Sequence, residues 1–314
     1  MSCATCHDPA TAFTSKDATA IGIQNRAGTR NAPTLLNVRF GKSYFWDGRS
    51  LTLENQAKQP LLNPSEMGMI DETAVVKRLS SIPEYRAQFR RVFGNESIAL
   101  NTVAQAIAAY ERTLVSRDSP FDRFLAGDGK ALTEGQLKGW ELFKGKARCI
   151  ECHTVTPLPL FTDSKFYNTG IAAQDQDVRV LSQRADELRL RSRDKRVSSN
   201  FLAHQVDFSE LGRFLVTQVE KDIGAFKTPT LRDVELTGPY MHNGSLRTLL
   251  DVVRFYNQGG HKNPYLDSKI RSLNLSEAEM NELVEFLRAL TGADVLRRVQ
   301  ASPPQTRVAI PLHP

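Results

Sequence analysis

Two short stretches of the chain repeat one arrangement of two cysteines and a histidine. They read Cys3-Ala4-Thr5-Cys6-His7 near the start and Cys149-Ile150-Glu151-Cys152-His153 near the middle. In a Cys-x-x-Cys-His pentapeptide, the thiols form thioethers with the porphyrin vinyl groups and the histidine supplies an imidazole to the iron. The sequence therefore predicts two covalently attached c-type haems, with His7 and His153 as iron ligands.

Two other interpretations account for these motifs less well. A zinc site needs about four ligands, mostly Cys and His, but each motif offers three and no fifth cysteine exists to complete either. A dithiol redox pair does not require the histidine that both copies carry. The motifs use all four cysteines of the chain. Haem attachment thus explains every thiol and leaves none for a structural disulfide.

The chain offers few side chains for the second axial position of the first haem. Its remaining histidines all lie in the second half: His204, His242, His261 and His313. The first haem can gain a local sixth ligand only from Met67, Met69, a tyrosine or a weaker group, and we expect its position to stay open. An open position on haem iron is where oxygen or peroxide chemistry occurs.

The four later histidines have competing interpretations. His204 lies in a polar segment and His313 lies in the tail, so we expect both to be exposed to solvent. His242 and His261 lie in glycine-rich turns, where a structural hydrogen bond and iron ligation both remain open. Ligand counting alone does not choose between these roles.

The segments that must position these residues have mostly helical patterns. A capped amphipathic helix is predicted over 132–143, ahead of the second motif, and another begins at the capping box from Ser276 to Glu279. Apolar spacing indicates further helices between 71 and 114, after Ser119 and from about 245, whereas the stretch up to about 63 is predicted to be loop-rich. No segment shows sustained strand alternation, so the expected fold class is all-α.

The length of 314 residues leaves room for about two domains. The turn around Gly127 and Gly129 is the predicted junction, which gives an N-terminal haem domain over 1–127 and a C-terminal haem domain over 128–314. A basic insertion near 172–208 is expected to form a solvated helix or a mobile segment. The two haem motifs are the only internal repeat that we identify.

Composition excludes several classes of function. The formal net charge is +6, but acids are interspersed with the bases and no nucleic-acid motif accompanies them, so no nucleic acid is expected. An acidic redox partner and a merely soluble surface are both compatible with this charge. No run of eighteen apolar residues occurs, so no membrane span is expected. The first motif lacks the helix that precedes the second, so we expect an upstream helix and an export signal in the full protein.

Further blocks of residues resemble one family. They are Phe45-Trp46-Asp47-Gly48-Arg49, then Gln56, Pro60, Asn63-Pro64 and Glu66-Met67-Gly68-Met69, then Gly224 to Arg232, and finally Pro239-Tyr240-Met241-His242-Asn243-Gly244. Their order and spacing around the two haem motifs are similar to those of the bacterial diheme cytochrome c peroxidase and MauG family. The resemblance covers nearly the whole chain except the insertion and the tail.

The resemblance implies two cytochrome c-like domains, with a peroxidatic haem in the first and a second haem that handles electrons. By this likeness Glu66 matches the distal acid/base, and Gln56 and Pro60 match residues that shape the distal pocket. Trp46 matches the indole between the haems. A carboxylate suits this role because heterolysis of peroxide needs a base that takes a proton from one oxygen and returns it to the other.

The resemblance also implies the surroundings of the enzyme. Asn31 and the carbonyls of Thr237 and Pro239 match a calcium site at the domain junction, and oxygen ligands suit that hard cation. Export to the periplasm is expected, as is a redox partner protein such as a cytochrome, a cupredoxin or an oxidised protein substrate. A homodimer is among the expected assemblies.

Two positions depart from the classical peroxidases. Ile23 falls where those enzymes place a histidine that blocks the distal site until reduction, so the first haem is expected to be open at rest. Tyr256 falls where they place an axial methionine, and MauG-like members have tyrosine there. A phenolate ligand favours ferric and higher states, whereas a thioether favours ferrous iron. Met241 remains the alternative ligand of the second haem.

The resemblance, together with these departures, implies a periplasmic diheme peroxidase of the MauG-like type. It would reduce hydrogen peroxide at the first haem and share the oxidising equivalents with a His153/Tyr256-ligated second haem to oxidise a protein or small-molecule donor. One alternative is an ordinary cytochrome c peroxidase that draws electrons from a small cytochrome or cupredoxin. A second alternative is a non-catalytic diheme electron carrier.

Overall fold

The computed structural model describes residues 1–94, 98–156, 160–174, 177–191 and 198–301. Its α-helices are α1 (Leu53–Leu62), α2 (Glu72–Ser80), α3 (Pro83–Phe93), α4 (Leu100–Glu111), α5 (Pro120–Leu125), α6 (Glu134–Lys144), α7 (Val178–Arg191), α8 (Ser199–Ala203), α9 (Phe214–Thr217), α10 (Leu249–Gln258), α11 (Glu277–Arg288) and α12 (Ala293–Ala301). Two short strands, β1 (Phe166–Tyr167) and β2 (Phe226–Lys227), pair antiparallel. His313 lies outside the described residues.

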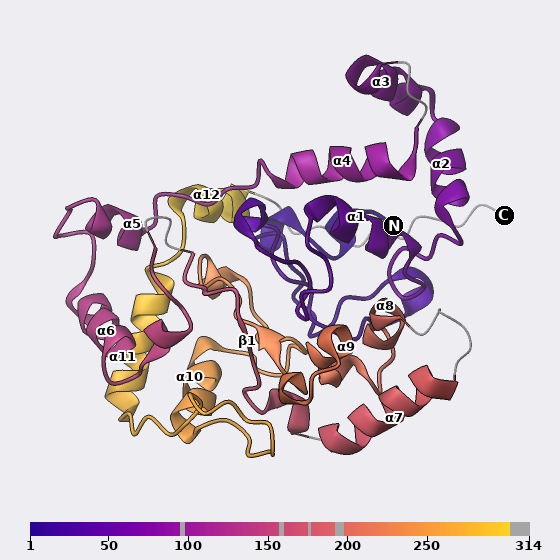
Figure 1. Cartoon of the computed structure of the whole chain (residues 1–314). Helices are drawn as coiled ribbons and strands as arrows, with labels where there is room; N and C mark the ends of the chain where they lie inside the picture. The colour runs from indigo at the N-terminus through magenta and orange to yellow at the C-terminus, as the bar shows by residue number, and fades with distance from the viewer. Residues whose placement is uncertain (95–97, 157–159, 175–176, 192–197, 302–314) are drawn as a thin grey trace.

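The prediction of a helix-rich chain is confirmed. Figure 1 shows α-helices joined by long irregular segments, with the small β1–β2 pair near the centre. The predicted capping boxes are present, with Thr133 capping α6 and Ser276 capping α11. Across the described ranges, no helix combines the length and the apolar character needed to cross a membrane.

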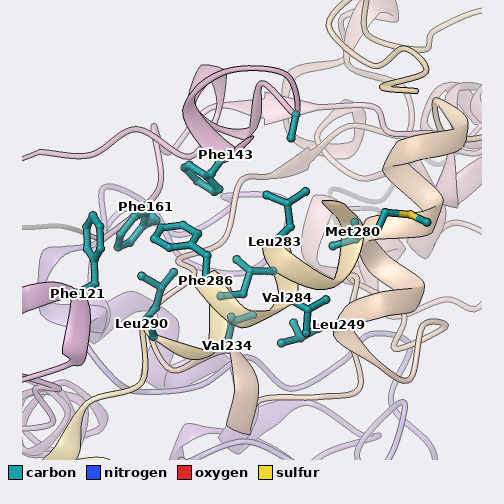
Figure 2. Packing of buried hydrophobic residues seen from close by; sticks show 14 of the residues in the cluster. Phe121, Phe143, Phe161, Val234, Leu249, Met280, Leu283, Val284, Phe286 and Leu290 are labelled. Atoms are coloured by element: carbon teal, nitrogen blue, oxygen red, sulfur yellow. The ribbon is translucent and has the colours of Figure 1, made fainter. Parts of the chain in front are cut away.

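The second half is built around an aromatic core between α6 and α11. Phe121, Phe143, Phe161 and Phe286 are each at most 1% exposed, and Figure 2 shows their rings gathered beside the aliphatic side chains of α11. Trp140 packs with its ring centroid 4.9 Å from that of Phe121. Trp140 is therefore a packing residue of this core.

A glycine allows the two helices of this core to approach closely. A Cβ atom at Gly139 in α6 would lie 2.0 Å from the carbonyl oxygen of Glu282 in α11. No side chain can be accommodated at that distance without moving a backbone. Gly139 therefore fixes the packing of α6, which leads directly into the second haem motif.

The first half has a separate core made by α1 to α4. Leu61, Val75, Phe89 and Val103 form its buried centre. Helix α1 was not predicted, because its apolar residues are few and Pro60 lies inside it. Tyr85 and Val92 of α3 and Tyr110 of α4 are exposed.

The division into two domains at residue 127 stays a prediction. The packing shows which segments near that junction belong to each core. Phe121 of α5 belongs to the core of the second half, although it precedes the expected junction at 127. Val295 of α12 returns to the first half and packs with Phe13 and Leu114. Figure 1 shows α12, in yellow, beside α4. The two ends of the chain therefore hold the halves together.

The described part of the basic insertion is not merely a solvated segment. Val178, Leu181 and Ala185 of α7 are buried against Leu202 of α8 and Leu215 of α9 in a third cluster. Arg179 and Arg184 of α7 are exposed, whereas Arg189 packs beside this cluster and donates to the carbonyl oxygen of Leu215. This cluster holds α8 in place at the edge of the candidate site.

Candidate active site

One continuous cavity of about 510 Å³ joins the two predicted haem motifs. Cys6 and His7 line it at one end, and Cys149, Cys152 and His153 line it at the other. Most of its remaining wall is apolar, with contributions from both halves of the chain. Its extent and its lining are those expected for two large apolar prosthetic groups held close together.

Both motif histidines are held in the orientation that an iron ligand needs. Nδ1 of His7 lies 3.1 Å from the carbonyl oxygen of Phe13, and Nδ1 of His153 lies 2.7 Å from that of Phe161. Because a carbonyl oxygen only accepts, each Nδ1 carries the proton and each Nε2 keeps its lone pair. Burial lowers the pKa of both rings. These residues fit a haem at each motif.

The motif thiols are also in the state that haem attachment requires. All four cysteines are free of disulfide bonds. Burial raises the pKa of the Cys6 thiol to about 11 and that of the Cys149 thiol to about 12. They are therefore neutral thiols at the mouth of an apolar cavity, ready for thioether formation.

Helix α1 and the loop after it bring the predicted distal residues together. Gln56, Pro60 and Glu66 all line the cavity. The loop is held against the segment around Gly22, where an added Cβ would lie 1.9 Å from the carbonyl oxygen of Ser65. The neighbouring amide of Ile23 donates to the carbonyl oxygen of Glu66 at 2.8 Å. Ile23 thus supports the Glu66 loop, at the position where a blocking histidine was expected to be missing.

The carboxyl of Glu66 is oriented by its own turn. Nδ2 of Asn63 donates to Oε1 at 2.6 Å, and the backbone nitrogen of Glu66 donates to the carbonyl oxygen of Asn63 at 3.0 Å. No described residue donates to Oε2. Burial raises the pKa of Glu66, while the Asn63 amide and the Arg49 guanidinium act in the opposite direction. The group therefore has the raised proton affinity that suits an acid/base.

The structure places His204 beside Glu66, and the expectation that His204 is exposed is wrong. Its side chain is 17% exposed, and Nε2 lies 3.7 Å from Oε1 of Glu66. Helix α8 carries it to the first half, where Oγ1 of Thr29 donates to the carbonyl oxygen of Ala203. No local sequence signal identifies His204, because the contact depends on the packing of α7 to α9.

A buried charge cluster lies next to these two residues. Asp47 is fully buried and pairs with Arg30 at 2.6 Å and with Arg49 at 3.0 Å. The two guanidinium groups hold the pKa of Asp47 below its usual range despite its burial. The guanidinium of Arg49 also stacks 3.5 Å from the ring centroid of Phe45. The Phe45-to-Arg49 block therefore contributes structure as well as the predicted indole.

Trp46 and His242 each make a backbone hydrogen bond across the contact between the halves. The backbone amide of Lys227 donates to the carbonyl oxygen of Trp46 at 2.8 Å, and that of Asn31 donates to the carbonyl oxygen of His242 at 2.7 Å. Nε2 of His242 is paired with Glu210 at 2.7 Å, and its ring stacks on Phe226. The structure thus favours the hydrogen-bonding role for His242.

Tyr256 and Met241 both line the cavity at the second motif. The Tyr256 hydroxyl makes no hydrogen bond to any described residue. Burial raises its pKa, and the nearby thiols of Cys152 and Cys149 add to the effect. Helix α10, capped by Thr248, therefore presents an unpaired phenol to the end of the cavity that holds His153.

The three predicted calcium ligands also lie along this cavity, between the halves. Asn31 is buried, and its Nδ2 donates to the carbonyl oxygen of Ala18 at 3.1 Å. Within the described ranges, nothing donates to Oδ1 of Asn31 or to the carbonyl oxygens of Thr237 and Pro239. Three uncommitted oxygens are the donor type that calcium takes.

The two halves share a repeat longer than the haem motifs, which the sequence interpretation missed. The segments Pro33–Val38 and Pro229–Val234 have matching residues at one constant separation. The same separation relates Asn37 (φ 61°) to Asp233 (φ 59°), the bridge from Tyr44 to Ser50 to the bridge from Tyr240 to Leu246, and α1 to α10. In this repeat Trp46 corresponds to His242, and Pro60 corresponds to Tyr256.

Comparisons with known proteins agree with this arrangement. The family model for di-haem cytochrome c peroxidase matches residues 1–130. Cytochrome-c peroxidase IdrP2 of Denitromonas iodatirespirans is 37% identical over 93% of this chain and 76% of the relative. Methylamine utilization protein MauG of Methylorubrum extorquens is 36% identical over 92% and 72%. A solved MauG-like protein associated with microbial copper homeostasis superposes with a TM-score of 0.76 at 28% identity, over 94% of this chain and 85% of that protein.

Proposed function

This chain belongs to the di-haem cytochrome c peroxidase family, and we propose that it is a MauG-like member whose second haem is ligated by His153 and Tyr256. It is a hydrogen-peroxide-dependent haem oxidoreductase with two c-type haems. In the proposed reaction, peroxide is reduced at an open first haem. The oxidising equivalents are shared with the second haem and oxidise a protein or small-molecule donor.

The unpaired phenol of Tyr256 carries this proposal. The Tyr256 hydroxyl makes no hydrogen bond to a described residue, and its side chain lines the cavity near Cys149 and Cys152. Coordination to the iron of the second haem would give this hydroxyl a partner. Met241 adjoins His242, whose backbone is already committed to the contact between the halves. Tyr256 is therefore the better candidate.

The position in the first half that is equivalent to Tyr256 supports an open site at the first haem. Pro60 stands on α1 where Tyr256 stands on α10, and a proline side chain has no atom that can ligate iron. Ile23 is bound to the Glu66 loop through its backbone and likewise offers no ligand. Neither position supplies a group to block peroxide.

The proposed role of Glu66 follows from its contacts. Haem attached at Cys3 and Cys6 supplies, when bound, the redox-active iron at which peroxide is reduced. Asn63 occupies Oε1 of Glu66, which leaves Oε2 to take the proton from one peroxide oxygen and return it to the departing oxygen, which leaves as water. Gln56 lines the cavity on the same helix as Pro60, and we assign it to orienting the peroxide.

Trp46 is the proposed connection between the two ends of the cavity. It lines the cavity together with residues of both halves. Its Nε1 donates to the carbonyl oxygen of Asn31 at 2.9 Å, and its own carbonyl oxygen accepts from Lys227. The indole is therefore fixed on both sides of the contact, as a constant electronic coupling would require.

We also propose the wider setting that the family suggests. The enzyme is placed in the periplasm, with calcium held by Asn31, Thr237 and Pro239. Its donor is a redox partner protein or a small molecule, and the possibility of a homodimer is kept as a proposal. Size measurements and calcium analysis of the holoprotein test the last two points directly.

The resting spectrum of the holoprotein tests the main proposal. Electron paramagnetic resonance should show one high-spin and one low-spin ferric haem, and no methionine-to-iron charge-transfer band should be visible. Tyr256→Met should create that band, and the control Met241→Leu should leave the second haem unchanged. A methionine band in the unsubstituted enzyme would instead identify an ordinary cytochrome c peroxidase. Two low-spin haems at rest, with no reaction with peroxide, would identify an electron carrier.

A further inference from the structure

His204 stands between the proposed acid/base and the nearest cation. Its Nε2 lies 3.4 Å from Nη2 of Arg49 and 3.7 Å from Oε1 of Glu66. Among the described residues, Glu66 and Arg49 are not paired with each other within 4.0 Å. The imidazole therefore separates two groups of opposite charge that would otherwise attract each other.

The protonation of His204 is set by its own helix. Nδ1 lies 2.6 Å from the carbonyl oxygen of Asn200, and a carbonyl can only accept, so Nδ1 carries the proton. Nε2 then offers a lone pair to the Arg49 guanidinium. Burial, together with the charge of Arg49, lowers the pKa of His204 to about 4. The ring is thus neutral, and it neither pairs with Glu66 as a cation nor donates to it.

The charges around the ring explain why this separation is needed. Arg30 and Arg49 share the single buried carboxylate of Asp47, so the cluster carries an excess of one positive charge. The charge of Arg49 acts on Glu66 across His204. A direct ion pair between Glu66 and Arg49 would lower the proton affinity of the carboxylate and occupy one of its oxygens.

We propose that His204 is a positioning residue, supplied by the second half of the chain, that keeps Glu66 from pairing with Arg49 and so keeps its carboxyl available for proton transfer. This inference rests on the proposed role of Glu66 and deepens it. The distal site of the first haem is then built by both halves, because α8 is held by Thr29 and by the bond from Nε of Arg49 to Oδ1 of Asn200. Figure 1 shows α8 below α1, within reach of the first half.

The test measures the protonation of Glu66 in the holoprotein without peroxide. The carboxyl band in infrared difference spectra is followed against pH and is assigned by its loss in Glu66→Gln. In His204→Ala the gap lets Arg49 reach Glu66, so the midpoint should fall by at least about one pH unit. His204→Phe keeps a ring of similar size and should retain the native midpoint.

Controls separate this role from general stability. His261→Ala removes another histidine of the second half, whose ring packs on Phe255, and should leave the midpoint unchanged. If His204→Ala does not fold, His204→Ser opens the same gap. An unchanged midpoint in the small variants, or a midpoint in His204→Phe as low as in His204→Ala, would overturn the proposal. Because no peroxide is used, the result does not depend on whether Glu66 moves the peroxide proton.

Discussion

Helices α1 and α10 are equivalent elements of the repeat, but they present different side chains to the two ends of the cavity. Each begins at a threonine cap, Thr52 or Thr248, after an equivalent turn. In the same turn of the helix, α1 carries Pro60 and α10 carries Tyr256. One copy therefore presents a side chain without a ligand atom, and the other presents a phenol. In the proposed enzyme, this single position decides which end of the cavity can admit a substrate.

The difference extends to the groups around the two helices. At the first motif the cavity is lined by the polar side chains of Gln56, Glu66 and His204. At the second motif the surroundings are an aromatic core, with Phe143 and Phe161 almost fully buried. Proton chemistry needs polar groups and a vacant position, whereas storing charge needs a rigid apolar setting. The same repeated element therefore stands in a polar setting at the first motif and in an apolar setting at the second.

The substitution with the largest expected effect makes the first half resemble the second. Pro60→Tyr should place a phenol over the first haem and lower the rate constant with peroxide by more than about 100-fold, because the vacant position is filled. Stopped-flow spectroscopy and the loss of the high-spin signal measure this. Pro60→Ala, which adds no ligand atom, is the control. A reactive Pro60→Tyr enzyme would break the proposed equivalence of the two helices.

The next largest effect removes the proton chemistry from the first half. Glu66→Gln should slow the reaction with peroxide by about 100-fold, the usual size of general acid/base help. Glu54→Gln is a matched control, because Glu54 lies on α1 and pairs with Arg112 at the surface. Equal rates for Glu66→Gln and the unsubstituted enzyme would remove Glu66 from the mechanism.

The aromatic core of the second half can be tested through its glycine. Gly139→Ala should lower the free energy of unfolding by about 2 to 3 kcal/mol, because the new methyl group meets the backbone of Glu282. Gly135→Ala on the same helix meets nothing within 4 Å and should raise it by up to about 1 kcal/mol. Urea titrations followed at the second haem measure both. Similar values for the two variants would show that α6 and α11 are not in such close contact.

The smallest effect concerns a buried acid of the first half. Oε2 of Glu111 is buried without a partner, and burial raises its pKa from 4.5 to about 7. The unfolded chain loses this proton near pH 4.5 while the folded chain keeps it to about pH 7, so stability should fall as pH rises through that window. Glu111→Gln should reduce the fall by roughly 2 kcal/mol. Urea titrations from pH 4 to 8 measure it, and an unchanged profile would contradict the assignment.

The haem motifs and most helices were accessible from the sequence because their signals are local. Two Cys-x-x-Cys-His pentapeptides identify their cofactor wherever they occur, and the caps Thr133 and Ser276 act within one turn of their helices. Helix α1 was missed, since Pro60 is an unusual residue inside a helix. The buried face of α7 was also missed, since its apolar residues are outnumbered by charged ones.

The sequence by itself determined the cofactors, the helical class and the candidates on each side of the irons. The tertiary structure alone decided which of them meet. His204 approaches Glu66 only because α7, α8 and α9 form a common core that brings α8 to the first half. His242 pairs with Glu210 for the same kind of reason. Spacing along a chain sets what one element presents, but contacts between distant elements depend on how their buried faces pack.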